Sequence, residues 1–152
     1  MTCPDDRYTV VFNGEIYNFE NLRAELKAAG ETFRSESDTE VVLRLYARLG
    51  TAFVERLDGM FALAIWDRID RSCFLARDPF GIKPLYVWRS QGAIAFASEL
   101  RAVLKAELEP AELCGEALRE YLLYGSVQEP MTLVKNVTAL QPGSWVLWKN
   151  GR

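Results

Sequence analysis

The chain has 152 residues, of which 49% are hydrophobic and 26% charged, with a formal net charge of −3 and a pI near 5.1. This composition is typical of a single globular domain, and its mild acidity excludes a general attraction to nucleic acid or anionic membranes. No apolar run is long enough to span a bilayer, and no secretory signal opens the chain. The three cysteines are widely spaced and indicate reduced thiols, so we expect a cytoplasmic protein without membrane or nucleic-acid partners.

The complete absence of histidine restricts the chemistry of the chain. Histidine is the usual general base and the commonest metal ligand in proteins. We therefore expect no metal site, and any catalysis must use carboxylates, amides, backbone groups or a terminal amine.

The first half of the chain predicts one strand followed by helices. Its expected elements are a strand that ends near residue 12, helices at 19–29 and 37–49, and a short helix at 52–57. Asn18, Ser37 and Thr51 are the expected N-caps of these helices. Glu40 stands three residues after Ser37, which is the capping-box pattern.

The second half changes to the period of strands. The expected strands are 60–66, 72–76, 85–89 and 93–97, separated by turns at 67–71, 77–84 and 90–92. Short helices at 99–105 and 114–124 and an apolar segment at 145–148 follow. We expect residues 77–84 to be a rigid turn rather than an anion-binding loop, because proline and glycine fix such turns. The order of helices, hairpin-linked strands and helices predicts an α+β domain with a largely antiparallel sheet.

The sequence VVFNGE at residues 10–15 places polar groups at the end of an apolar strand. The side-chain amide of Asn13 and the backbone N–H of Gly14 can point at one spot and form an oxyanion hole. The carboxylates of Glu15 and Asp38 can accept hydrogen bonds from an ammonium group, so the set suits an amino-acid ligand. The alternative is that residues 13–14 form only a turn and Asp38 belongs only to a helix cap.

Five motifs in order carry a resemblance to a known family: FNGEIYN, SDTEV, LDGMFA, ARDPFGIKPLY and ASEL, which begin at residues 12, 37, 57, 76 and 97. The set resembles the glutamine amidotransferase domain of glutamine-hydrolysing asparagine synthetase, a class II, N-terminal-nucleophile amidotransferase. The resemblance implies a layered α/β/β/α fold with mostly antiparallel sheets. It also implies that Asn13 and Gly14 are the catalytic oxyanion donors, and that Glu15 and Asp38 bind the α-amino end of glutamine.

The chain departs from that family at its N-terminus. The resemblance implies a cysteine nucleophile, further strands and an Arg-Gly-Pro-Asp loop upstream of Asn13, and only twelve residues precede it here. Thr2 and Cys3 lie in a turn-like stretch and are not expected to replace the nucleophile. We therefore expect a partial amidotransferase domain over residues 1–152, with Met1 an internal methionine of a longer ancestor and the N-terminal strands missing.

The expected function follows from the family resemblance and from the lack of the upstream elements that the resemblance implies. We expect an amidotransferase domain of asparagine biosynthesis that is inactive alone and binds L-glutamine weakly. Its expected partners are the missing amidotransferase segment and a synthetase domain. No cofactor is expected in this chain, because ATP and magnesium would belong to the absent synthetase domain. The alternative is a glutamine-binding regulatory or interaction module without catalysis.

Overall fold

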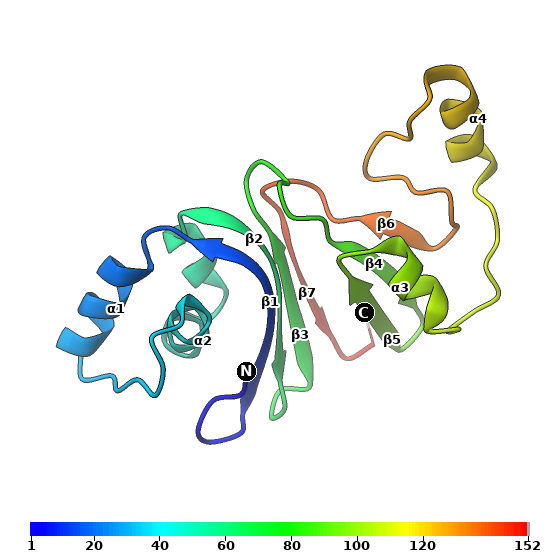
Figure 1. The fold of residues 1–152 in the computed structure, drawn as a ribbon. Helices are drawn as coiled ribbons and strands as arrows, with labels where there is room; N and C mark the ends of the chain where they lie inside the picture. Colours follow the sequence, from blue (N-terminus) through cyan, green and yellow to red (C-terminus); the bar gives the residue numbers. More distant parts are fainter. Residues whose placement is uncertain (152) are drawn as a thin grey trace.

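The computed structural model describes residues 1–151 and arranges them in layers (Figure 1). A helical layer covers one face of a four-stranded sheet, whose other face packs on a three-stranded sheet, and a short helix covers the far side of the second sheet. In chain order the elements are β1 (Tyr8–Ile16), α1 (Phe19–Ala28), α2 (Asp38–Leu49), the 3-10 helix η1 (Gly50–Arg56), β2 (Gly59–Asp67), β3 (Ser72–Arg77), β4 (Tyr86–Ser90), β5 (Ala93–Ala97), α3 (Leu100–Lys105), α4 (Gly115–Tyr124), β6 (Val137–Ala139) and β7 (Trp145–Lys149).

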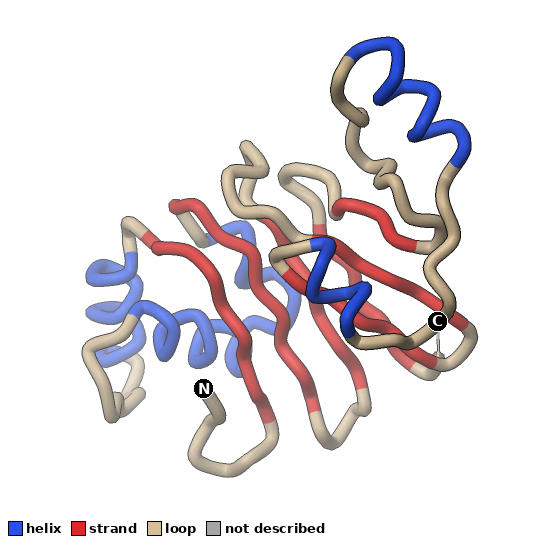
Figure 2. The backbone as a smooth tube through the Cα atoms, turned by 45° about the vertical axis from the view of Figure 1, so that its right-hand side comes forward, coloured by secondary structure: helices blue, strands red, loops and turns tan. Residues whose placement is uncertain are grey.

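Both sheets are antiparallel throughout. Figure 2 shows their strands side by side. The four-stranded sheet has the order β1-β2-β3-β7, and the three-stranded sheet has the order β5-β4-β6. β1 pairs with β2 without interruption from Tyr8 opposite Asp67 to Ile16 opposite Gly59. The expected α+β class, with layers of mostly antiparallel sheet, is confirmed.

The core between the helices and the four-stranded sheet is rich in aromatic residues. Tyr46 of α2, Phe53 of η1 and Phe74 of β3 pack with ring centroids 5.4 to 5.7 Å apart. The Tyr46–Phe53 and Phe53–Phe74 pairs are edge-to-face, and such contacts add to the free energy gained from burying the rings. The central strand β2 is buried on both faces, which explains why residues 61–65 are continuously apolar rather than alternating.

Small residues line the contact between the two sheets. Ala62, Ala64 and Cys73 of the first sheet pack against Leu85 and Val87 at the start of the second. Burial raises the pKa of the Cys73 thiol to about 11, so it remains a neutral thiol in the core. Cys73 is therefore the buried hydrophobic residue that the strand pattern predicts.

The expected rigid turn after β3 is confirmed and is organised by Asp78. Its buried carboxylate accepts hydrogen bonds from the backbone N–H groups of Phe61, Phe80, Ile82 and Lys83 at 3.0 to 3.3 Å. Burial alone would raise the pKa of this carboxyl group, but the four N–H donors outweigh it and hold the pKa below the ordinary aspartate value. The turn is thus built on a buried charge that backbone dipoles neutralise.

Arg77, the neighbouring residue, fastens the same turn to the end of the chain. Its guanidinium group donates to the carbonyl oxygens of Gly81, Lys83 and Leu140 at 2.7 to 2.8 Å. Two further N–H groups donate to the carboxylate of Glu129 at 2.6 and 3.1 Å. Because the Arg77 side chain is buried and its donors are satisfied in a planar fork, it fixes three segments relative to one another.

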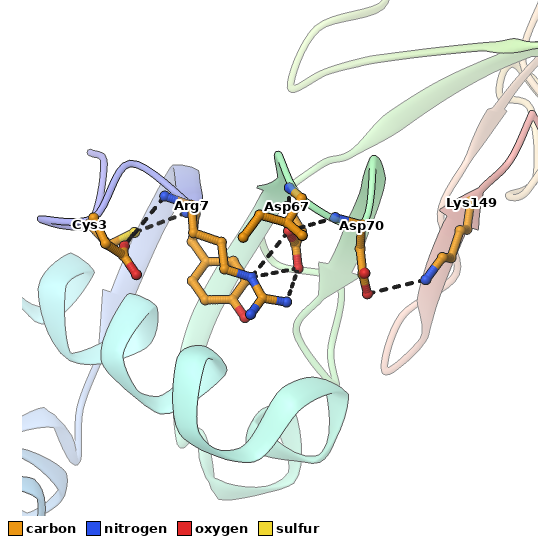
Figure 3. Close-up of polar contacts among 8 residues, drawn as sticks. Cys3, Arg7, Asp67, Asp70 and Lys149 are labelled. Carbon is orange, nitrogen blue, oxygen red and sulfur yellow. Dashed lines mark hydrogen bonds and ion pairs between the residues drawn. The ribbon is translucent and has the colours of Figure 1, made fainter.

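A row of polar contacts ties the strands together at the other end of the first sheet (Figure 3). Arg7 donates to the carboxylate of Asp67 at 2.9 Å, and Lys149 donates to Asp70 at 3.1 Å. These pairs connect the residues before β1, the β2–β3 turn and the last strand.

The structure corrects several expectations about helix ends. Asn18 occupies the N-cap position of α1, but its side chain bonds to Arg56 and Asp58 instead of capping the helix. Ser37 caps α2 through the N–H of Thr39, whereas the Glu40 carboxylate binds the preceding loop, so the reciprocal capping box is absent from this part of the described chain. The third helix is a 3-10 helix that begins at Gly50, so Thr51 is not its N-cap. The short strand β6 was not expected.

Candidate functional site

The end of β1 presents Asn13, Gly14 and Glu15 at the edge of the four-stranded sheet (Figure 1). The direction of each backbone N–H follows from the antiparallel pattern, in which it alternates between the two sides of a strand. The N–H of Val10 donates to Met1 and that of Ile16 to the side chain of Asp38, so both point away from β2. Gly14 lies between them with the same parity, so its N–H also points to this outer edge.

Asp38 is brought to the same place by the start of α2. Its Oδ2 accepts a hydrogen bond from the backbone N–H of Ile16 at 3.1 Å, and its Oδ1 accepts one from the Thr39 hydroxyl at 3.3 Å. The Asp38 residue is half-buried. The structure therefore places Asp38 beside Ile16 at the end of β1, although the two residues are 22 positions apart in the chain.

Asn13 points from the same strand end toward the second sheet. Its Nδ2 donates to the hydroxyl oxygen of Ser98, which follows β5, at 3.2 Å. Because a primary amide has two N–H groups, one can be held by Ser98 while the other remains available to a ligand. Sequence reasoning assigned no role to Ser98, although it lies in the ASEL motif at residues 97–100.

Gly14 is required by the close approach of two backbones. A Cβ atom at this position would lie 2.1 Å from the carbonyl oxygen of Met60 and 2.7 Å from the Cα of Phe61. Gly59, the partner of Ile16, is equally tight, because its Cβ would lie 2.2 Å from the carbonyl oxygen of Glu15. Two glycines on facing strands thus let β1 and β2 meet without side chains in between.

Glu15 completes the group as an exposed carboxylate on the same sheet face as Asn13. The strand end therefore carries two N–H donors and the Glu15 carboxylate, and α2 adds the Asp38 carboxylate, which is bonded to the next residue of the strand, Ile16. N–H donors that converge on one point stabilise a negative oxygen, and carboxylates bind an ammonium group. The geometry suits a small ligand that has an amide carbonyl at one end and an amine at the other.

Thr2 and Cys3 lie at the opposite end of β1 from Asn13. The backbone of Thr2 bridges to Thr9, and the Cys3 Sγ donates to the Asp5 carboxylate at 2.7 Å. Burial and the neighbouring Asp5 raise the pKa of the Cys3 thiol, which suppresses the thiolate that a nucleophile needs. The structure gives neither residue access to the strand end that carries Asn13.

An apolar cavity of about 330 Å³ lies between the two sheets beside β1. Its lining includes Val11 of β1, Trp66 of β2, Phe96 of β5 and Trp148 of β7. The second sheet does not extend over Val11, whose side chain is 62% exposed. Asn13, Gly14 and Glu15 are not among the residues that line this cavity, which offers little polar chemistry of its own.

The described residues, 1–151, contain no helix long and apolar enough to cross a membrane. They also contain no group of three metal-ligating side chains that could hold an ion.

Comparisons with known proteins agree with these motifs. The family described as "Glutamine amidotransferase domain" matches residues 1–152. Asparagine synthetase [glutamine-hydrolyzing] 1 of Bacillus subtilis strain 168 is 44% identical over 144 residues, which are 95% of this chain and 23% of the relative. Asparagine synthetase [glutamine-hydrolyzing] 3 of Arabidopsis thaliana is 47% identical over 100 residues, 65% of this chain and 17% of the relative. This chain thus spans less than a quarter of the length of these curated relatives.

A solved structure of glutamine phosphoribosylpyrophosphate amidotransferase from B. subtilis, complexed with ADP and GMP, has a similar fold. The TM-score is 0.64 at 21% identity, over 99% of this chain and 29% of the other. At this identity the likeness shows the fold alone. Because the family match extends over its whole length, the chain belongs to the glutamine amidotransferase domain family.

Proposed function

We propose that residues 1–152 form the glutamine-binding part of the amidotransferase domain of an asparagine-synthetase-type protein. The observation that supports the proposal is the hydrogen bond from the Ile16 N–H to Asp38, which attaches this carboxylate to the strand end that carries Asn13 and Gly14. The 44% identity with the B. subtilis asparagine synthetase supports glutamine, rather than another amino acid, as the ligand. The free cysteines support a cytoplasmic location, which belongs to the same proposal.

In the proposed reaction, glutamine and water give glutamate and ammonia. The Asn13 amide and the Gly14 N–H stabilise the negative charge that develops on the carbonyl oxygen when the side-chain amide is attacked. Glu15 and Asp38 hold the α-ammonium group by charge-assisted hydrogen bonds. The nucleophile comes from a segment outside these 152 residues, and ATP and magnesium act in the synthetase domain that accepts the ammonia.

The test is a titration of the isotope-labelled chain with L-glutamine, followed by NMR. We expect the resonances of the Gly14 and Ile16 amides and of the Asn13 side chain to shift, with a dissociation constant of about 1 mM or weaker, because the site is incomplete. D-Glutamine and L-glutamate are the controls and are expected to bind more weakly. Unchanged resonances at these positions contradict the proposal. A micromolar constant favours the alternative, a glutamine-binding regulatory module.

A further inference from the structure

The loop between α1 and α2, residues 29–37, leads directly into Asp38, the first residue of α2. The two helices lie beside each other on the same face of the four-stranded sheet (Figure 1). Each helix contributes one buried charged side chain that faces the loop. Arg23 of α1 is 6% exposed and Glu40 of α2 is 5% exposed. Most of the hydrogen bonds of these two side chains go to the loop itself.

Arg23 holds the loop through its carbonyl oxygens. Its Nη1 donates to the carbonyl oxygen of Ser35 at 2.9 Å, and its Nη2 donates to that of Ser37 at 3.0 Å. The Nη1 also donates to the carboxylate of Glu36 at 2.6 Å. The carbonyl group of Ser37 belongs to the peptide that joins Ser37 to Asp38. The Arg23 guanidinium group therefore fixes the peptide plane from which Asp38 starts.

Glu40 holds the same loop through its N–H groups. Its carboxylate accepts hydrogen bonds from the backbone N–H groups of Arg34 and Ser35 at 2.7 to 3.1 Å, and from the Ser35 hydroxyl at 2.7 Å. Burial raises the pKa of this carboxyl group, but the hydrogen bonds from the loop outweigh it and hold the pKa below the ordinary glutamate value. Ser35 is thus held by an anion at its N–H and by a cation at its carbonyl oxygen.

Stability alone does not account for two buried charges at this loop. Taking an ion out of water costs free energy, and apolar residues in place of buried ions are often neutral or stabilising. Each charge also has a different ion-pair partner, Glu36 for Arg23 and Arg44 for Glu40. The Nε of Arg23 is buried and has no hydrogen-bond partner among residues 1–151. What the two side chains provide is one defined conformation of residues 34–37.

We propose that Arg23 and Glu40 are positioning residues for Asp38, an inference that rests on the proposed role of Asp38 as a ligand of the glutamine ammonium group. A charge-assisted hydrogen bond requires the carboxylate at one distance and in one direction. The bond from the Ile16 N–H to Asp38 Oδ2, at 3.1 Å, marks that position at the end of β1. A Ser37–Asp38 peptide free to turn would carry the carboxylate away from Ile16 and from the ligand.

The consequence for function is selectivity for a ligand that has an α-amine. The amide end of glutamine is assigned to Asn13 and Gly14 of β1, which do not belong to the loop. The side chain of Asn13 is instead held by Ser98, after β5. Release of the loop should therefore weaken the hold on the ammonium group and leave the hold on the amide unchanged.

The test compares L-glutamine with glutaramate, which is glutamine without its α-amine, in NMR titrations of the isotope-labelled 152-residue chain. In the wild type we expect L-glutamine to bind about fivefold more tightly or better. Arg23→Met retains an unbranched apolar side chain and removes all the hydrogen bonds to the loop. It is expected to bring the ratio of the two dissociation constants close to one, while that of glutaramate changes by less than about twofold.

Hydrogen exchange of the Ile16 amide provides a readout that does not involve glutamine. In Arg23→Met we expect this amide to exchange faster by about tenfold, because Asp38 no longer stays in place to accept from it. Arg23→Lys keeps the charge without the planar fork, so its effects are expected to be intermediate, and it replaces Arg23→Met if that variant does not fold. Glu40→Gln tests the other side of the loop and is expected to act in the same direction. Arg7→Met, which breaks the ion pair with Asp67 at the opposite end of β1, is the matched control and should change neither readout.

The outcomes separate this inference from the proposed function. An unchanged ratio together with unchanged Ile16 exchange overturns the inference, and so does an equal loss of affinity for both ligands, which reports a general loss of structure. A lost preference for L-glutamine with unchanged Ile16 exchange also overturns it, because the effect then does not pass through Asp38. Faster Ile16 exchange in a chain that does not distinguish the two ligands supports the positioning of Asp38 and contradicts only the proposed function.

Discussion

The carboxylate of Asp38 accepts a hydrogen bond from the backbone N–H of Ile16 at 3.1 Å and so joins the start of α2 to the end of β1. Without this bond the edge strand would leave a polar N–H unpaired at its end. The same carboxylate is the proposed partner of the glutamine ammonium group. Asp38 therefore has two roles that substitution can separate.

Asp38→Asn is expected to preserve the fold and to abolish glutamine binding, because a carboxamide oxygen still accepts from Ile16 but carries no charge. Asp38→Ala is expected to lose binding and also about 1–2 kcal/mol of unfolding free energy, since the Ile16 N–H loses its acceptor. Urea denaturation measures the stability, and the thermal shift with L-glutamine measures binding. Equal thermal shifts with L-glutamine in the wild type and in Asp38→Asn would contradict the assignment of Asp38 as a ligand of the ammonium group.

The chain alone is expected to release no glutamate from glutamine. The described residues place no free thiol at Asn13, and Cys3 is a buried thiol at the other end of β1. An enzyme-coupled glutamate assay against a buffer control checks this. Turnover that disappears in Cys3→Ala or Thr2→Ala would show that one of these residues is a nucleophile after all.

Gly14→Ala is expected to cost more than about 2 kcal/mol of unfolding free energy, because the new methyl group collides with the Met60 backbone and separates β1 from β2. The matched control is Gly115→Ala, where an added Cβ meets no atom within 4 Å at the start of α4. That control is expected to be neutral or slightly stabilising, since alanine favours helix. Comparable losses in both variants would contradict the close approach at Gly14.

The buried carboxylate of Asp78 is expected to make stability fall in acid. Because its pKa is lower in the folded chain than in the unfolded chain, its contribution is complete above about pH 4 and is lost as the pH falls through the folded pKa. Asp78→Asn is expected to cost about 3 kcal/mol near neutral pH, and the difference from wild type shrinks in acid. Asp70→Asn, at an exposed ion pair, is the control and changes stability by less than about 0.5 kcal/mol. A pH-independent difference between wild type and Asp78→Asn would disprove the linkage.

The open edge of β1 is expected to make the isolated chain aggregate. Among the described residues, no strand pairs with this edge between the contact of Val10 with Met1 and that of Ile16 with Asp38, and the exposed Val11 adds apolar surface beside it. Val11→Lys is expected to slow the growth of light scattering without changing the circular dichroism spectrum, because a charge on an edge opposes strand addition. Leu122→Glu serves as the comparison, since it alters a different surface. Prolonged monodispersity of the wild-type chain at high concentration would contradict this expectation.

Local sequence patterns predicted much of this fold, because each strand is a short segment of continuous or alternating apolar residues between clear turn signals. The strands at 60–66 and 72–76 and the rigid turn at 77–84 correspond closely to the structure. β6 has three residues and little pattern, so only its pairing with β4 defines it. The side-chain partners of Asn18 and Glu40 depend on the tertiary structure. Asn18 bonds to Arg56 and Glu40 bonds to Arg34, so neither side chain makes the capping hydrogen bond that the local sequence predicts.

For the site, the roles of Asn13, Gly14, Glu15 and Asp38 stay a prediction, and the contacts that hold this part of the chain could not be predicted from the sequence. The bond from Asn13 to Ser98 joins positions 85 residues apart, and spacing along the chain carries no information on it. The exposure of α4 was equally hidden, because the apolar pattern of residues 117–124 is that of a helix packed against a core. Which surface receives such a helix depends on the tertiary and quaternary structure.

The hydrogen bonds of the Arg77 guanidinium group also affect the order in which parts of the protein fold. Its acceptors include Glu129 and the carbonyl oxygen of Leu140, which lie 52 and 63 residues later in the chain. During synthesis on the ribosome, Arg77 emerges before these acceptors. Its guanidinium group therefore stays hydrated until residues 129–140 have emerged. The fold around Arg77 is therefore completed only after residues 129–140 have emerged, and the proposed glutamine site and the α4 segment become fixed relative to each other at that step.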